Sequence, residues 1–156
     1  MGVSRLAVTD ETFMRRALVL AQNAEMQGEV PVGALIVDPD GRVIAEAANG
    51  PIGLNDPTAH AEVLALRQAG NALGNYRMPG CTMYVTLEPC AMCAAALVHA
   101  RMRRLVYGAP DPKTGACGTV LNIPSAPGMN HKIEIVGGEL AEKCGELLTV
   151  FFSRRR

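Results

Sequence analysis

Apolar residues recur at helical spacing near the start of the chain and form short unbroken runs further along it. An apolar stripe that follows Thr9 or Asp10, a good N-cap and first-turn pair, predicts a helix that ends at Gly28. The runs Gly33–Val37 and Arg42–Ala45 flank the sequence Asp-Pro-Asp-Gly, whose residues favour tight turns. They are therefore expected to form two strands of a hairpin.

Helices and strands are expected to alternate through the rest of the chain. After a Gly- and Pro-rich loop at Asn49–Pro57, the expected elements are a helix from about Ala59 to Ala69 with Thr58 as its N-cap, a strand at Cys81–Leu87, a helix from Pro89 to about Ala100, strands at Arg104–Gly108 and Lys132–Val136, and a closing helix at Glu139–Phe152. This order indicates an α/β/α layered fold with about five strands. The order alone leaves the strand pairing open.

Composition narrows the class of protein. A chain of 156 residues, 49% of them apolar, is long enough for one domain with a buried core, and we take residues 1–156 as that single domain. The charges of fifteen basic and fifteen acidic residues cancel, so any contact with nucleic acid has to come from a local group of residues and not from the net charge. The sequence has no run of 18 apolar residues and no secretory signal at Met1–Val8, which predicts a cytoplasmic protein without membrane spans.

Candidate metal ligands stand at two predicted helix starts. The first start reads Thr58-Ala-His-Ala-Glu62, and the second reads Leu87-Glu-Pro-Cys-Ala-Met-Cys93. Cys90 and Cys93 are three positions apart, so on a helix they can hold one ion between them. His60 can join them if the ion lies over the helix ends, where the positive ends of both helices would also favour thiolates.

One imidazole and two thiolates suit Zn²⁺, and the number of ligands indicates the role of the ion. Structural zinc sites use four protein ligands, whereas catalytic sites leave one position for water. With His60, Cys90 and Cys93 as ligands, zinc would lower the pKa of a bound water molecule. Glu62 would then carry protons and would not bind the metal.

Other interpretations of these residues remain open at this point. A C-x-x-C pair that opens a helix is also typical of thioredoxin-like redox proteins. His99 and His131 are interpreted as ordinary surface or core residues, and the remaining cysteines as small packing residues. Those cysteines are Cys81, Cys117 and Cys144.

The combined pattern His-Ala-Glu and Pro-Cys-Ala-Met-Cys resembles the zinc-dependent cytidine and adenosine deaminase superfamily. Longer stretches resemble the bacterial tRNA-specific adenosine deaminases over most of the chain, from about Glu11 to Phe152. These stretches are Glu29-Val-Pro-Val-Gly-Ala34, Asn55-Asp-Pro-Thr-Ala-His-Ala-Glu62, Tyr84-Val-Thr-Leu-Glu-Pro-Cys90, Asp111-Pro-Lys-Thr-Gly115 and Pro127-Gly-Met-Asn-His131.

This resemblance implies a cytidine-deaminase-like fold with a mixed five-stranded sheet, one zinc ion per subunit and a homodimer. It implies hydrolysis of the wobble adenosine of a tRNA anticodon loop to inosine by a zinc-activated hydroxide, with His60, Cys90 and Cys93 as ligands and Glu62 as the proton shuttle. By the same resemblance the substrate-binding residues would be Val30, Asn49, the Ala61 main chain and Asp111.

Two departures from the resemblance concern RNA contacts. Gly50 stands where a larger, often basic residue is expected, and the chain stops early, at Ser153-Arg-Arg-Arg156. Arg154–Arg156 could be a solvated tail or could contact phosphates. The competing functions are a deaminase of free guanine, cytosine or nucleosides such as cytidine, and a redox or structural zinc protein.

Overall fold

The computed structural model describes residues 9–155 as five helices and five strands, with one short 3-10 helix. Residues 1–8, on which the expectation of no signal peptide rests, lie outside the described residues, as does Arg156. The helices are α1 (Asp10–Met26), α2 (Pro51–Leu54), α3 (Ala61–Leu73), α4 (Ala91–His99), α5 (Ala141–Ser153) and the 3-10 helix η2 (Ile123–Ser125). The strands are β1 (Gly33–Val37), β2 (Val43–Ala48), β3 (Thr82–Leu87), β4 (Arg104–Ala109) and β5 (Glu134–Gly137).

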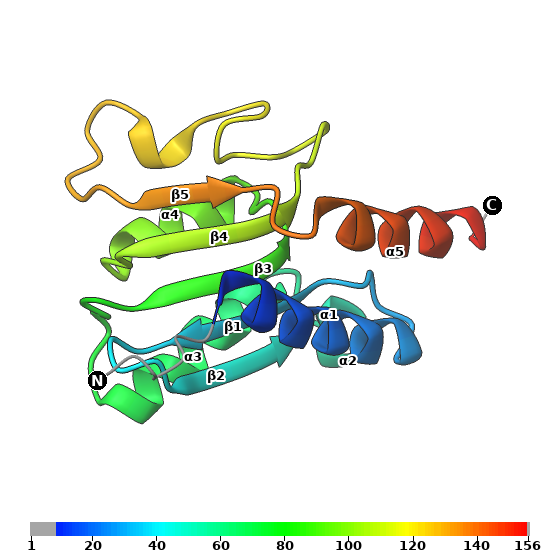
Figure 1. Ribbon diagram of the computed structural model, residues 1–156, viewed down its shortest axis with the longest axis horizontal. Coiled ribbons are helices and arrows are strands. Elements are labelled where there is room, and N and C mark those ends of the chain that lie inside the picture. The colour runs from blue at the N-terminus through cyan, green and yellow to red at the C-terminus, as the bar shows by residue number, and fades with distance from the viewer. Residues whose placement is uncertain (1–8, 156) are drawn as a thin grey trace.

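The strands form one mixed sheet in the order β2-β1-β3-β4-β5. β1 pairs antiparallel with β2, which confirms the predicted hairpin, and it also pairs antiparallel with β3. β3, β4 and β5 run parallel to one another. The carboxyl ends of β2, β3 and β4 therefore meet at one edge of the sheet (Figure 1).

Helices cover both faces of this sheet, which confirms the predicted three-layer α/β/α architecture. α1 and α5 pack on one face, and α3 and α4 lie side by side on the other (Figure 1). Successive residues of β1 point to opposite faces, so Ala34 and Ile36 join the core beneath α3 and α4, while Leu35 and Val37 join the core beneath α1. All five residues of β1 are consequently buried.

Close packing of α1 on the sheet depends on a residue without a side chain. A Cβ atom on Gly33 would overlap the carbonyl oxygen of Ala17 and the backbone nitrogen of Ala21. The alanines of the α1 stripe and this glycine together bring the helix axis near the strand. Within residues 9–155, no helix combines the length and the apolar character that a membrane span requires.

Several predicted element ends were wrong by one to four residues, and α3 continues to Leu73, four residues beyond the predicted end at Ala69. Thr58 does not cap α3, because its hydroxyl and its backbone N–H both donate to Asp56 Oδ1, at 2.7 and 2.8 Å; α3 begins at Ala61 with His60 as N-cap. Pro89 lies just before the N-cap of α4 instead of inside its first turn. The segment expected to be only a loop contains α2, with Pro51 as its first residue.

Similar shifts affect the second half of the chain. α5 begins at Ala141 and not at Glu139, because Leu140 adopts a left-handed backbone conformation with φ 56°. β2 extends to Ala48, three residues beyond the predicted strand, because its pairing with β1 continues as far as Gly33. Thr9 is the N-cap of α1, as predicted, and accepts a hydrogen bond from the backbone N–H of Thr12.

An ion pair ties the start of α1 to the edge of the sheet opposite to the carboxyl ends of the parallel strands. Arg104, the first residue of β4, donates two hydrogen bonds of 2.8 and 2.7 Å to the Asp10 carboxylate, and the hydroxyl of Tyr84 donates a third of 2.7 Å. The hydrogen bonds from Arg104 hold the pKa of the Asp10 carboxyl below its ordinary value, and the bond from Tyr84 acts in the same direction. The ionised carboxylate therefore stabilises the folded state.

We expect Asp10→Asn to lower the free energy of unfolding at pH 7 by about 1.5–3 kcal/mol, the range for hydrogen bonds to charged groups. The contribution should be complete above the unfolded-state pKa, near 3.8, and should be lost as the pH falls through the lower folded-state pKa. Urea denaturation of both proteins at pH 7 and at about pH 3 checks this, since the difference between them should shrink in acid.

Glu11→Gln is a matched control for this change. Glu11 also lies in the first turn of α1, so it shares the favourable interaction with the helix dipole. Its ion pair with Arg15 is exposed, with 53% of each side chain accessible, and should contribute less than about 1 kcal/mol. Equal losses of stability in the two variants would contradict a special role for Asp10.

Candidate active site

A pocket of about 740 Å³ opens at the edge of the sheet where β2, β3 and β4 end. Its walls come from the segments that follow these strands, from the residues that precede β1, and from the last two turns of α5. In α/β folds, this edge is where ligands usually bind. His60, Glu62 and Cys90 all line the pocket, so the two predicted helix starts do meet there.

His60 is positioned as the N-cap of α3. Its backbone is extended, with φ −68° and ψ 152°, and its carbonyl oxygen accepts the first helical hydrogen bond, from Leu64. The preceding turn is held by Asp56, which accepts two hydrogen bonds from Thr58 and lies 3.6 Å from Arg67. The imidazole is half-buried and faces the second helix start.

Cys90 and Cys93 are the N-cap and the third residue of α4. Cys90 has an extended backbone and is half-buried, whereas Cys93 is fully buried. The Sγ atoms of Cys90 and Cys93 lie 3.7 and 3.5 Å from His60 Nδ1. The ligand atoms of all three residues lie within 4.8 Å of one another.

These distances fit zinc. In a tetrahedral site with Zn–S bonds of about 2.3 Å and Zn–N bonds of about 2.0–2.1 Å, a sulfur and a nitrogen ligand lie about 3.6 Å apart. Both observed S···N distances are within about 0.2 Å of that value. Three protein ligands would leave one of the four positions of a tetrahedral zinc ion for water, as catalytic zinc sites require.

The protonation of the cluster without metal follows from its hydrogen bonds. Hydrogen bonds from Cys93 and His60 lower the pKa of the Cys90 thiol to about 3. The same contact with Cys90, together with burial, raises the pKa of Cys93, and the hydrogen bond to Cys90 raises that of His60. Zinc, which binds thiolates and neutral imidazole, therefore has to displace protons from Cys93 and His60.

Glu62 is the second residue of α3 and lies beside the cluster. Its side chain is 4% exposed yet still lines the pocket. Burial raises the pKa of the Glu62 carboxyl to about 7, while a charged His60 acts in the opposite direction. A carboxyl with a pKa near neutrality can both accept and donate a proton, which is the property of a general acid–base group.

The structure brings three of the four predicted substrate-binding residues to the pocket. Val30, Asn49 and Asp111 line it, from the segment before β1, the end of β2 and the end of β4. Ala61 is fully buried and is not among the lining residues. The predicted contact of the Ala61 main chain with substrate stays a prediction.

Sequence reasoning missed two parts of the pocket wall. One is Glu88, a buried carboxylate between Leu87 and Pro89; its position next to the C-x-x-C motif was the only available signal. The other is α5, which contributes Gly145, Leu148, Thr149 and Phe152. No pattern in the sequence indicated that the last helix would line the same pocket as His60 and Cys90.

The remaining histidines and cysteines lie outside the metal cluster. His131 Nε2 lies 2.7 Å from the carbonyl oxygen of Met102, which fits the prediction of an ordinary, satisfied residue. Cys81, Cys117 and Cys144 are buried and unpaired, as expected of packing residues.

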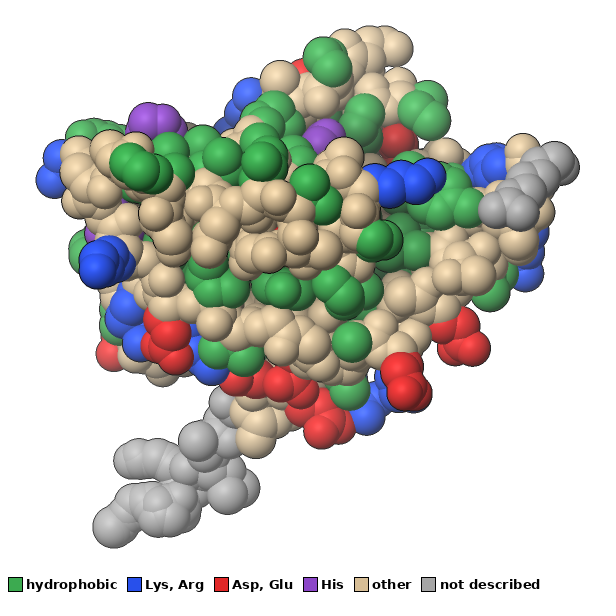
Figure 2. All heavy atoms as spheres, turned by 90° about the horizontal axis from the view of Figure 1, so that it is seen from above, with side chains coloured by type: hydrophobic (Ala, Val, Ile, Leu, Met, Phe, Trp, Pro, Cys, Tyr) green, Lys and Arg blue, Asp and Glu red, His purple; other side chains and the backbone are tan. Residues whose placement is uncertain are grey.

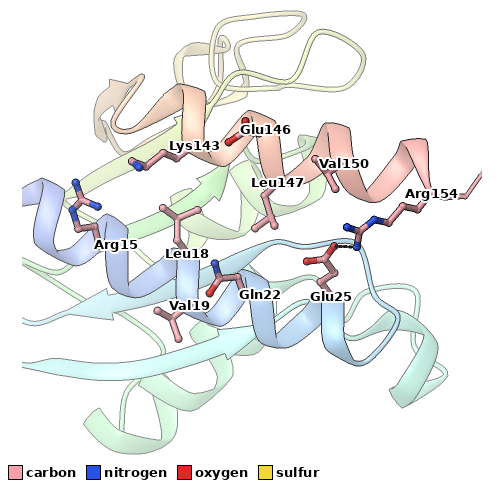
Figure 3. Close-up of a pocket in the computed structure, with 10 residues that line it drawn as sticks. All are labelled: Arg15, Leu18, Val19, Gln22, Glu25, Lys143, Glu146, Leu147, Val150 and Arg154. Carbon is pink, nitrogen blue, oxygen red and sulfur yellow. Dashed lines mark ion pairs between the residues drawn. The ribbon is translucent and has the colours of Figure 1, made fainter.

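Arg154 and Arg155, near the end of the chain, have partners within the protein. Arg154 lies over the hollow between α1 and α5, 4.0 Å from Glu25 (Figure 3). The guanidinium of Arg155 lies 4.2 Å from the centre of the Phe151 ring. Contacts of these residues with phosphates therefore stay a prediction, and Arg156 lies outside the described residues.

Comparison with known proteins agrees with this geometry. Residues 7–109 match the family model of the cytidine and deoxycytidylate deaminase zinc-binding region. A tRNA-specific adenosine deaminase of Haemophilus influenzae is 50% identical over 147 residues, which cover 94% of this chain and 85% of that protein.

Two solved structures extend the comparison to the fold. A structure from a study of A-to-I editing by tRNA:A34 deaminases at the wobble position has a TM-score of 0.85 and 49% identity, covering 87% of this chain and 98% of that one. The guanine deaminase of Bacillus subtilis has a TM-score of 0.64 and 35% identity, with 94% of each chain covered. The chain thus belongs to the cytidine and deoxycytidylate deaminase family of zinc-binding proteins, in which the tRNA-specific adenosine deaminases resemble it over most of its length.

Proposed function

We propose that this protein hydrolyses the wobble adenosine of a tRNA anticodon loop to inosine. The observation that carries the proposal is the His60, Cys90 and Cys93 cluster with Glu62 beside it in one pocket. The identity of 50% to a tRNA-specific adenosine deaminase supports this choice of substrate. One zinc ion per subunit is the cofactor, since the described residues hold one such cluster.

Zinc held by His60, Cys90 and Cys93 would supply a hydroxide near neutral pH. Glu62 accepts one proton from the attacking water and passes it to the ring nitrogen of adenine; it then takes the second proton from the new C6 hydroxyl and gives it to the departing amine. The pKa near 7 that burial gives Glu62 suits both directions of transfer. The bond that forms is C6–O, the bond that breaks is C6–N, and ammonia leaves.

The substrate base has to leave its stack to enter this pocket. Asn49 and Asp111 offer polar side chains on opposite walls, and Val30 offers an apolar surface for the base. Unstacking costs least in a loop, where the base is already unpaired. These three residues, with the main chain of Ala61, are the proposed substrate contacts.

A free-base deaminase is the second candidate, because a guanine deaminase is 35% identical to this chain. That identity, and the TM-score of 0.64, are lower than the 49% and 0.85 of the tRNA:A34 deaminase structure. Deamination of free guanine, cytosine or cytidine is therefore the alternative that the substrate experiment has to exclude. The redox interpretation of Cys90 and Cys93 has lost its support, because His60 Nδ1 lies within 3.7 Å of both sulfur atoms, at distances that fit a shared zinc ion.

We further propose a homodimer that works in the cytoplasm, where tRNA is modified. The face that carries the segment between β4 and β5 has hydrophobic side chains across its middle and charged ones near its margins (Figure 2). Val120, Leu121 and Met129 of this segment are 51, 50 and 38% exposed, and Met92 of the adjoining α4 is 37% exposed. Exposed apolar side chains gathered on one face are typical of subunit contacts.

The purified chain should carry one zinc ion, and Cys90→Ser or Cys93→Ser should lose it, because two ligands do not hold zinc tightly. Elemental analysis of protein prepared without added metal measures the zinc content. Cys81→Ala is the matched control: Cys81 is buried at the opposite end of β3, so its loss should leave zinc in place. Stoichiometric zinc in Cys93→Ser would contradict the ligand assignment.

Replacing Glu62 by Gln should leave zinc and the fold intact while turnover falls by at least about 10²- to 10⁴-fold, the contribution of general acid–base groups. Gln has nearly the same shape but cannot take up the proton. Inosine formation and zinc content are measured on the same samples. Loss of zinc in proportion to activity would show that Glu62 is a ligand instead.

A wobble-adenosine anticodon stem-loop should be deaminated faster than free guanine, cytosine or adenosine at equal concentration. Contacts with the flanking nucleotides lower the barrier, so truncated substrates should lose rate as well as affinity. Ammonia release measures the turnover of each substrate, and sequencing of the RNA product identifies the deaminated base. Faster turnover of any free base or nucleoside would favour the second candidate.

A further inference from the structure

The described part of the chain buries three glutamates, and two of them, Glu29 and Glu88, have no role in the proposed chemistry. Glu29, Glu62 and Glu88 are 3, 4 and 2% exposed. Carboxylates are almost never buried this deeply unless they have partners. Glu62 faces the zinc ligands, whereas Glu88 lies at the base of the pocket and is turned toward another segment.

The partners of the Glu88 carboxylate all belong to the segment that follows β4. The backbone N–H of Asp111 donates to Glu88 Oε1 at 3.0 Å, and those of Cys117 and Thr119 donate to Oε2 at 2.9 and 3.1 Å. The hydroxyl of Thr119 donates to Oε1 as well. One carboxylate thus fastens both ends of residues 111–119, with charge-assisted hydrogen bonds that are about twice as strong as neutral ones.

This segment forms one wall of the pocket. Asp111, Pro112, Lys113 and Thr114 all line it. The Asp111 carboxylate accepts hydrogen bonds from the backbone of Lys113 and Thr114 and from the Thr114 hydroxyl, which fixes the turn itself. The Asp111 carboxylate therefore fixes the turn of the wall, and the Glu88 carboxylate attaches the wall to the end of β3.

Gly115 lets the segment lie directly on Glu88. A Cβ atom at this position would be 2.5 Å from Glu88 Oε1 and 2.6 Å from the carbonyl oxygen of Asp111. Since real Cβ atoms do not approach so closely, any side chain here would push the segment off the carboxylate. The contact between the segment and the carboxylate thus depends on Glu88, which accepts the hydrogen bonds, and on Gly115, which leaves room for them.

From these contacts we infer that Glu88 is a positioning residue, which fixes residues 110–119 as a wall of the substrate pocket and so governs binding of the RNA around the target base. The inference rests on the proposed function for its substrate. A preformed wall spares the ordering cost that a mobile loop would pay on binding. Glu88 acts through Asp111 and its neighbours, and takes no part in proton transfer.

The test disturbs this contact from each side. Glu88→Gln and Gly115→Ala should each lower kcat/KM for the wobble-adenosine anticodon stem-loop by roughly ten- to hundredfold, as displacement of positioning groups by about 1 Å does. Most of the change should be in KM, and zinc content should stay at the wild-type level. Glu88→Ala should be worse than Glu88→Gln, because Gln retains one carbonyl acceptor for the segment.

A binding measurement distinguishes a positioning role of Glu88 from a catalytic one. With Glu62→Gln as the background, in which turnover is suppressed, adding Gly115→Ala should raise the Kd of the same stem-loop by a factor similar to the rise in KM. Asp38→Ala is the matched control, because Asp38 also accepts two backbone hydrogen bonds, of 2.9 Å each, but at the opposite end of β1. It should leave KM, kcat and Kd unchanged.

The results that would contradict the inference differ from those that would contradict the proposed function. Wild-type KM and Kd in both Glu88→Gln and Gly115→Ala would overturn the inference while leaving the proposed function intact. Loss of zinc from Glu88→Gln, with unchanged KM in Gly115→Ala, would also overturn it and would assign Glu88 to support of the metal ligands. Failure of the wild-type chain to deaminate the stem-loop would instead overturn the proposed function.

Discussion

The geometry of the pocket depends on one constraint, that an imidazole and two thiolates have to lie about 3.6 Å apart around a single ion. His60 and Cys90 are both N-caps, so the constraint applies to whole helices: α3 and α4 have to begin at the same point. They can do so because they lie side by side on one face of the sheet. Alanines on their buried sides, among them Ala65 and Ala94, let both helices sit close to the strands.

The same convergence sets the electrostatics of the site. The positive ends of two helices favour the thiolates of Cys90 and Cys93 once zinc is bound. Glu62 is one residue inside α3, so the helix end favours its charged form while burial opposes it, and burial is the larger effect. The carboxyl thereby has a pKa suited to proton transfer, and its backbone is fixed by the helix that also fixes His60.

Irregular segments complete the pocket, and buried carboxylates hold them in place. Glu88 accepts hydrogen bonds from residues 111–119, and Glu29 accepts hydrogen bonds of 3.1 and 2.7 Å from the backbone of Ile52 and Gly53. Both glutamates precede residues that line the pocket, Val30 and Cys90 among them. The rigid part of the fold therefore extends into loops that would otherwise be free to move.

The sequence by itself determined the elements whose signals are local. The Thr9 cap and Gly28 define α1, the Asp-Pro-Asp-Gly turn defines the hairpin, and the spacing of Cys90 and Cys93 predicts that they share one ion, because helix starts and spacing within one helix depend on near neighbours. The addition of His60, 30 residues before Cys90, was expected from the family resemblance. Only the tertiary structure decided which strands pair, that α5 reaches the pocket, and that Glu88 holds a segment 23 to 31 residues away. Such contacts join residues whose separation in the chain follows no helical or strand period, so no pattern along the sequence records them.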